Sequence, residues 1–83
     1  MTYSIIIPKK VQKQLQKIPL IHRKKIRKTI AFLAFDPNLG KKLTGELKDK
    51  RSIRIWPYRI IYKVYKKEVI VLILSVSHRQ SVY

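Results

Sequence analysis

The apolar run VIVLILSV at residues 69–76 constrains the fold more than any other stretch of the chain. Successive side chains of a strand point to opposite faces of a sheet, and this run is apolar on both faces. We therefore expect it to form a central strand of the sheet. The run is also far shorter than the ~20 apolar residues that a membrane-spanning helix needs.

Three further segments have the composition of strands. Residues 2–7 are rich in β-branched and aromatic side chains, and residues 51–56 and 58–65 alternate from one face to the other. Pro57 separates the last two segments, and a short turn at residues 66–68 precedes the apolar run. The C-terminal half is thus predicted to be three consecutive strands joined by tight turns.

Between the first strand and residue 36 the apolar spacing changes to that of helices. Apolar residues recur every three or four positions, which predicts amphipathic helices between Pro8 and Pro19 and over residues 21–35. The predicted core positions of the two helices are Val11, Leu15, Ile18, Ile26, Ile30 and Leu33. Residues 38–50 hold both glycines and are expected to be a loop.

The order strand, two helices, three strands predicts a single α+β domain over residues 1–83. We expect the N-terminal strand and the three antiparallel strands to form one sheet, with the helical hairpin packed on one face. Alternation places Tyr58 and Tyr62 on the core face, and it points Arg54 and Arg59 away from the helices. Trp56 is expected to pack at the turn between these two strands.

Charge is the second strong feature. Twenty Lys and Arg against four Asp and Glu give a formal net charge of +16, with 11 basic residues and 1 acidic residue in positions 1–42. A domain of this charge favours nucleic acid as its partner, with an acidic protein segment second. An anionic membrane ranks last because we expect no helix to expose a bulky apolar face beside a basic one. The residues predicted to contact RNA phosphates are Arg23, Lys24, Arg27, Lys41, Lys42, Lys48, Lys50 and Arg51.

Several classes of site have no signature in the sequence. There is no cysteine, the four acidic residues are scattered, and the two histidines, His22 and His78, are far apart. This argues against a zinc or carboxylate metal site, and no glycine-rich nucleotide-binding loop is present. We therefore expect no metal and no cofactor, and we read His22 as an ordinary surface residue. The N-terminus does not resemble a signal peptide, so we expect a cytoplasmic protein.

Metal-free cleavage of RNA is compatible with these residues, because RNA carries its own nucleophile. A 2′-OH attacks the adjacent phosphorus when a base takes its proton, cations stabilise the phosphorane, and an acid protonates the 5′ leaving oxygen. Arg suits the second task, and His suits either proton transfer because its pKa is near ~6.5. The last strand delivers His78 and Arg79 to one end of the sheet. If strand order brings Arg54 and Arg59 to the same end, the outer face gathers all four side chains.

Three sequence pieces carry a family resemblance. They are KLTG at residues 42–45, YRIIY at residues 58–62 and HR…VY at residues 78–83. Together with the order of elements they resemble the RelE/ParE toxins, and the RelE-like branch in particular, over nearly the full chain. The resemblance implies a microbial RNase-like fold and a toxin held inactive by an acidic, RelB-like antitoxin. Its RelE branch implies metal-independent mRNA cleavage in the ribosomal A site, so the implied partners include ribosome and mRNA.

The resemblance also implies site residues. The catalytic Arg of the family's Tyr-Arg pair matches Arg59, and the Arg that follows the last strand matches Arg79. The C-terminal Tyr that can act as the base matches Tyr83. RelE-type sites usually have two basic residues on the preceding strand. One of these positions is Arg54 in this chain, but the other is Ser52, so one cation of the family's site is missing. His78 is the second candidate for proton transfer and is slightly favoured, because its pKa needs no large shift.

Three alternatives remain open at this point. A ParE-like toxin inhibits DNA gyrase and has no nuclease activity. A basic RNA-binding protein of the ribosome binds RNA in a salt-sensitive way and arrests no growth. The third alternative is a degenerate toxin, in which the replacement of a basic residue by Ser52 marks the loss of toxin activity.

Overall fold

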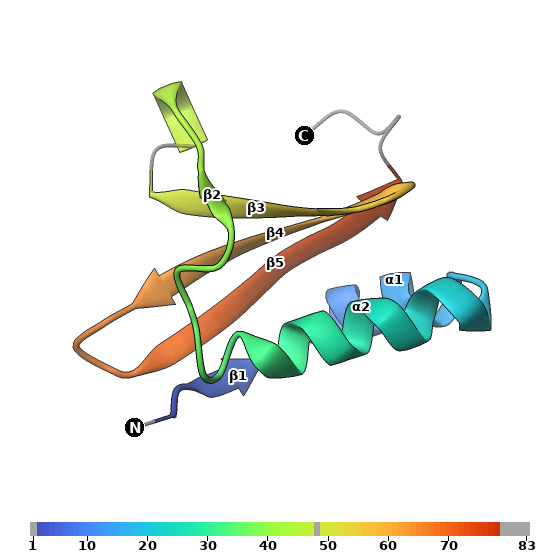
Figure 1. Cartoon of the computed structure of the whole chain (residues 1–83), viewed down its shortest axis with the longest axis horizontal. Helices are drawn as coiled ribbons and strands as arrows, with labels where there is room; N and C mark the ends of the chain where they lie inside the picture. The colour runs from blue at the N-terminus through green and yellow to red at the C-terminus, as the bar shows by residue number, and fades with distance from the viewer. Residues whose placement is uncertain (1, 48, 79–83) are drawn as a thin grey trace.

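The computed structural model describes residues 2–47 and 49–78, and it has the α+β architecture predicted from the sequence (Figure 1). In chain order the elements are β1 (Ser4–Ile6), α1 (Lys9–Gln16), α2 (Leu20–Phe32), β2 (Lys41–Lys42), a 3₁₀ helix (Gly45–Leu47), β3 (Lys50–Ile55), β4 (Tyr58–Tyr65) and β5 (Ile70–His78). The sheet has five strands in the order β1-β5-β4-β3-β2, one strand more than expected. In the described ranges, no helix is long and apolar enough to cross a membrane.

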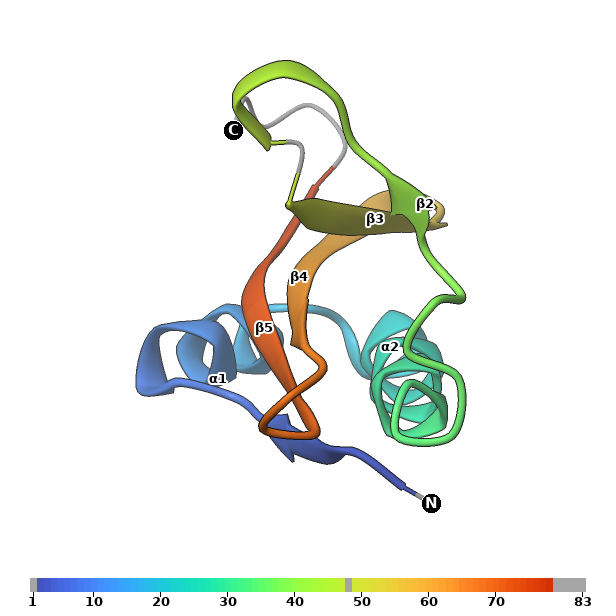
Figure 2. The ribbon, with the colours of Figure 1, turned by 90° about the vertical axis from the view of Figure 1, so that its left-hand side faces the viewer.

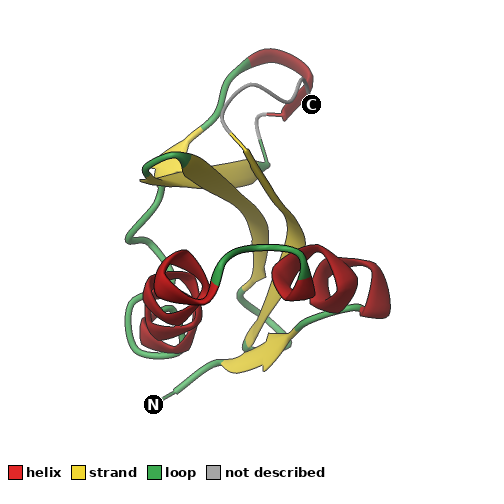
Figure 3. Cartoon of the chain, turned by 90° about the vertical axis from the view of Figure 1, so that its right-hand side faces the viewer, coloured by secondary structure: helices red, strands yellow, loops and turns green. Residues whose placement is uncertain are grey.

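The apolar run forms most of β5, which has a neighbouring strand on each side as predicted. β1 lies parallel to it and β4 antiparallel. Val71 and Ile73 of β5 are fully buried. The two helices lie side by side beneath the long strands, whereas β2 and β3 extend away from them (Figures 2 and 3). One face of the β3–β4 hairpin is therefore left open by the helices.

The core contains the six helical positions that the apolar spacing predicted, all of which are buried. They pack against the inward side chains of β4 and β5, which are Ile60, Tyr62, Val71, Ile73 and Val76. The prediction that Tyr62 belongs to the core is confirmed, and Tyr58 packs against the edge of the same cluster. The second helix ends at Phe32, shorter than predicted, and residues 33–35 form a turn.

A bulge in β5 changes which side chains face the helices. The pairing of β4 with β5 slips by one residue between Ile61 and Tyr62, so that Leu74 is an extra residue on β5. Beyond a bulge of this kind the alternation of side chains is reversed. Val76 therefore returns to the core face, and His78, two residues further on, lies on that face as well.

A buried tyrosine hydroxyl fixes the segment in front of β2. Tyr62 is fully buried, and its hydroxyl donates to Pro37 O at 2.8 Å and accepts from the Gly40 N–H at 2.7 Å. Arg51 Nη1 donates to Gly40 O at 2.8 Å. These three hydrogen bonds hold residues 37–40 against the sheet and so place β2 beside β3, where the sequence predicted only a loop.

Burial of Tyr62 gives a pH-dependent stability. Burial raises the pKa of Tyr62 above its ordinary value of 10.0, although the hydrogen bond from Gly40 and the charge of Arg51 lower it. The unfolded chain therefore ionises this tyrosine first, and the free energy of unfolding falls as the pH rises above ~10. In urea unfolding, we expect the stability advantage of wild type over Tyr62→Phe to be constant below pH ~10 and to shrink above it. An advantage that keeps its size at pH ~11 would contradict this assignment.

Candidate active site

Two arginines stand opposite each other on the open face of the sheet. Arg54 of β3 pairs with Arg59 of β4, and Ser77 of β5 lies opposite Arg59. Residues directly opposite in an antiparallel pair share a face, and the neighbouring pair, Ile53 and Ile60, faces the core. The strand order thus brings the end of β5 to the same end of the sheet as both arginines.

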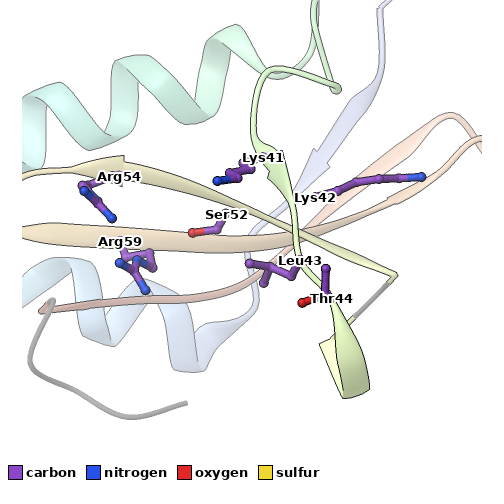
Figure 4. A pocket seen from close by; sticks show the side chains of 7 residues that line it. All are labelled: Lys41, Lys42, Leu43, Thr44, Ser52, Arg54 and Arg59. Carbon is purple, nitrogen blue, oxygen red and sulfur yellow. The ribbon is translucent and has the colours of Figure 1, made fainter.

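A cleft of about 640 Å³ opens in front of the two arginines (Figure 4). Its lining residues are Lys41, Lys42, Leu43, Thr44, Ser52, Arg54 and Arg59. The side chains of Lys41 and Ser52 point toward the arginines, whereas that of Lys42 points away from them. Among the residues that the structure describes, no acidic side chain lines the cleft.

The charges of the cleft favour an anionic ligand. Like charges directly opposite on a sheet repel each other, so an anion bound between Arg54 and Arg59 would offset their repulsion. A phosphate accepts two parallel, charge-assisted hydrogen bonds from a guanidinium, and these are stronger than hydrogen bonds between neutral groups. The carboxylate of Asp49 lies near a different cation, with its Oδ2 atom 3.8 Å from Lys63 Nζ. Over residues 2–47 and 49–78, no three His, Cys, Asp or Glu side chains are grouped as a metal site.

His78 lies at the same end of the sheet as the arginines but on the other face. Its ring stands edge-on to Tyr58, with ring centroids 5.5 Å apart and an interplanar angle of 82°. His22 of α2 contacts the same tyrosine ring, also at 5.5 Å. The expectation that the outer face gathers His78 is therefore wrong, because the bulge at Leu74 reverses the alternation. His22 is not an ordinary surface residue either, since it is half-buried in this stack of three rings.

Trp56 was expected to pack at the β3–β4 turn, and this expectation is wrong. Its side chain is 62% exposed. Only Trp56 and Pro57 lie beyond the last strand pair, Ile55 and Tyr58, so the turn lies outside the paired part of the sheet.

The other predicted RNA contacts lie in three places. Lys24 and Arg27 are exposed on α2, on the opposite side of the sheet from the cleft. Arg23 is half-buried, with its Nε donating to Ile18 O at 3.2 Å. Arg51 holds the Gly40 carbonyl, and Lys50 is half-buried at the start of β3. Lys48, Arg79 and Tyr83 lie outside the described residues, so the roles expected of them stay predictions.

The sequence did not single out Leu43 and Thr44 as cleft residues. They follow directly on β2, and the Leu43 N–H donates to Lys50 O at 3.0 Å, which continues the pairing with β3. The only signal in the sequence is their place within the KLTG piece at residues 42–45.

Helix α2 exposes apolar side chains beside its basic ones, contrary to expectation. Ile21 is 68% exposed and Phe32 is 51% exposed, and Phe35 just beyond the helix is 68% exposed. The spacing of Ile21, Lys28 and Phe32 puts them on one outward stripe of the helix. The stems of Lys24, Lys25, Arg27 and Lys28 line a second hollow of about 500 Å³ on this helix. The surface is thus apolar at both ends and cationic in the middle.

The chain is similar to solved structures of RelE toxins. The chain matches the RelE chain in the RelBE2 toxin–antitoxin complex from Mycobacterium tuberculosis with a TM-score of 0.86 at 27% identity, over 95% of this chain and 100% of that one. It matches the archaeal RelE–RelB complex from Pyrococcus horikoshii with a TM-score of 0.78 at 28% identity, over 99% and 100% of the two chains. The isolated E. coli RelE toxin, at 23% identity, shares the fold with a TM-score of 0.83 over 96% of this chain and 87% of that one.

A family model also matches the sequence. It is that of the ParE toxin of the type II toxin–antitoxin system parDE, and it matches residues 5–83. The comparison with curated proteins gave no match. Since the family model covers almost the whole chain and the fold is that of RelE toxins, the chain belongs to the RelE/ParE superfamily and is the toxin of a type II toxin–antitoxin system.

Proposed function

We propose that this toxin is a RelE-type, ribosome-dependent endoribonuclease that cleaves mRNA in the A site and thereby inhibits translation. The observation that supports this most is the cleft on the open face, where Arg54 and Arg59 stand opposite each other. A site of paired guanidiniums suits a phosphodiester whose charge increases in the transition state.

The reaction that we propose uses only groups of the RNA and of the protein. The 2′-oxygen bonds to the adjacent phosphorus, the bond from phosphorus to the 5′-oxygen breaks, and a 2′,3′-cyclic phosphate is left. A base takes the proton of the 2′-OH, and an acid gives a proton to the 5′-oxygen. Arg54 and Arg59 bind the non-bridging oxygens and stabilise the phosphorane, where the negative charge is greatest.

His78 and Tyr83 are the two candidates for the proton transfers, and the ring contact between His78 and Tyr58 disfavours His78. A phosphate between Arg54 and Arg59 lies on the opposite face of the sheet from this ring. His78→Phe keeps an aromatic ring against Tyr58 but removes the titrating nitrogen. We expect it to cleave at nearly the wild-type rate with an unchanged pH–rate profile, measured on defined mRNA with ribosomes.

Two further variants complete this experiment. His78→Ala removes the ring contact as well and is expected to lower stability and activity together. Tyr83→Phe is expected to lower the cleavage rate by about 10²-fold, the contribution of a general base. A His78→Phe protein that is folded but cleaves at least as slowly as Tyr83→Phe would make His78 a proton carrier.

The surface of α2 supports an acidic, amphipathic segment of the cognate antitoxin as its partner. The helix carries five Lys and Arg and no acidic residue, and exposed Ile21 and Phe32 flank the cations. These two residues are eleven positions apart, or about 16 Å along the helix axis. A partner helix with acids in the middle and apolar residues near both ends complements this stripe in charge and in contact area.

Removing one apolar end of the stripe tests the docking of the antitoxin. Phe32→Ala is expected to weaken the affinity for the antitoxin about tenfold by titration calorimetry, because exposed aromatic anchors carry much of an interface's energy. Ile6→Ala, which truncates a 43% exposed side chain on β1, is the matched control. If wild type and Phe32→Ala bind the antitoxin with equal affinity, the antitoxin binds a face of the toxin other than this surface of α2.

The match to the ParE family model supports a second candidate, inhibition of DNA gyrase without nuclease activity. The two candidates differ in a direct assay. A gyrase inhibitor blocks supercoiling of relaxed DNA by purified gyrase and leaves mRNA intact. The endoribonuclease leaves supercoiling unaffected and cuts mRNA on the ribosome.

A further inference from the structure

The short strand β2 carries a lysine to the place where β3 has a neutral side chain. Lys41 pairs with Ser52, and Lys42 pairs with Arg51. Because cross-strand partners share a face, Lys41 lies on the open face with Ser52 and Arg54, and Lys42 is directed to the other face. Figure 4 shows the same division, with Lys41 pointing toward the arginines and Lys42 away from them.

We propose that Lys41 is the third cation of the active site and contacts the scissile phosphate together with Arg54 and Arg59. This inference rests on the proposed endoribonuclease function. Ser52 lies two residues from Arg54 on the same face, which is about 7 Å along the strand. The long stem of Lys41, one strand over from Ser52, carries its ammonium across this gap as a point charge that needs no fixed orientation.

Neighbouring cations on β3 are less suited to this place. Arg51 pairs with Tyr62, which faces the core, and its guanidinium donates to Gly40 O at 2.8 Å. Lys50 pairs with Lys63 at the far end of the hairpin from Arg54 and does not line the cleft. Of the basic residues beside Ser52 in the described part of the chain, Lys41 and Lys42 line the cleft. Figure 4 shows the side chain of Lys41 pointing toward the arginines and that of Lys42 pointing away from them.

Hydrogen bonds hold the backbone on both sides of Lys41, so little conformational entropy is lost from this backbone when a ligand binds. Gly40, the residue before it, is bonded to Tyr62 and Arg51. Leu43, two residues after it, donates to Lys50 O at 3.0 Å. A cation on a strand fixed in this way is preorganised for a ligand, and preorganised charges contribute most to transition-state stabilisation.

To test this, the rates of cleavage of a defined mRNA on ribosomes are compared for variants of two adjacent lysines and for a variant that moves the positive charge to position 52. Lys41→Ala is expected to lower the cleavage rate about ten- to hundredfold, the range for one lost hydrogen bond to a charged group. Lys42→Ala removes the same charge from the next position and is expected to cost much less. In the Lys41→Ala background, Ser52→Lys places an ammonium on the same face of β3 and is expected to restore most of the rate.

Each outcome of this comparison decides the inference. If wild type cuts mRNA and Lys41→Ala cuts equally fast, Lys41 is not part of the site, although the proposed function stands. If Lys41→Ala and Lys42→Ala lower the cleavage rate equally and Ser52→Lys does not restore it, the loss is a general effect of charge. This result would also overturn the inference about Lys41. If wild type itself does not cut, the proposed function falls and takes this inference with it. Thermal unfolding of each variant separates loss of the fold from loss of the site.

Discussion

Arg59→Ala should lower the rate of ribosome-dependent mRNA cleavage by about 10²- to 10³-fold, the effect of removing one preorganised donor to an oxyanion. Arg59 stands opposite Arg54 on β3 and lines the cleft, so its guanidinium is placed to bind the phosphate whose charge grows during the reaction. Its removal also relieves the repulsion between the two arginines. The protein is expected to stay folded while the activity falls, and urea unfolding of Arg59→Ala checks this.

The control for this prediction is a basic residue far from the cleft. Lys67 is exposed in the turn between β4 and β5, at the opposite end of β4 from Arg59. Lys67→Ala removes one charge from a protein with a net charge of +16 and should leave the cleavage rate nearly unchanged. Arg59→Lys, which keeps the charge but loses the bidentate fork, should fall between wild type and Arg59→Ala. A folded Arg59→Ala protein that cleaves as fast as Lys67→Ala would remove Arg59 from the active site.

Gly40→Ala should lower the free energy of unfolding by about 2–4 kcal/mol, as overpacking and a lost buried hydrogen bond do together. A Cβ atom on Gly40 would lie 2.6 Å from the hydroxyl oxygen of Tyr62 and 3.0 Å from Ile53 Cγ1. Tyr62 is fully buried and has little room to move. Either the tyrosine or the segment before β2 must shift, and both shifts break the hydrogen bonds that position Lys41.

The second glycine provides the matched control for this prediction. Gly45 has a φ of 68°, but a Cβ atom there would meet nothing within 4 Å. Gly45→Ala is therefore expected to lower the free energy of unfolding only by the cost of a left-handed backbone conformation in a residue with a Cβ atom, which is about 1–2 kcal/mol. Urea unfolding of both variants, with Tyr62→Phe as a third, measures the difference. If Gly40→Ala is no less stable than Gly45→Ala, the close packing of Gly40 on Tyr62 is not what holds β2 in place.

The sequence was sufficient to predict the parts of the fold that depend on side-chain period. The spacing of Leu15 and Ile26 placed both helices on the core, and alternation placed Tyr62 inside. The face of Arg54 and Arg59 followed from the same alternation, because the β3–β4 hairpin has no bulge between these residues. Periodicity is reliable in these segments since burial of one face decides their register.

Two features of the site depend on contacts that periodicity does not report. Strand β2 has only two residues and no apolar alternation, and it is held by hydrogen bonds between Tyr62 and a segment more than twenty positions away. The face of His78 is set by the bulge at Leu74, inside a run whose residues are apolar on both faces and so give no sign of a slip. The position of Lys41 beside Ser52 and the contact of His78 with Tyr58 therefore had to come from the structure.

We expect the cationic cleft to cut mRNA on the ribosome. Primer extension on a defined mRNA in a purified translation system tests it most directly, with wild type and Arg59→Ala, each in the presence and absence of ribosomes. We expect cuts within A-site codons for wild type with ribosomes, and none for Arg59→Ala or without ribosomes. Intact mRNA from folded wild-type toxin on translating ribosomes would contradict the claim, and blocked supercoiling by purified gyrase would then make the protein a gyrase inhibitor.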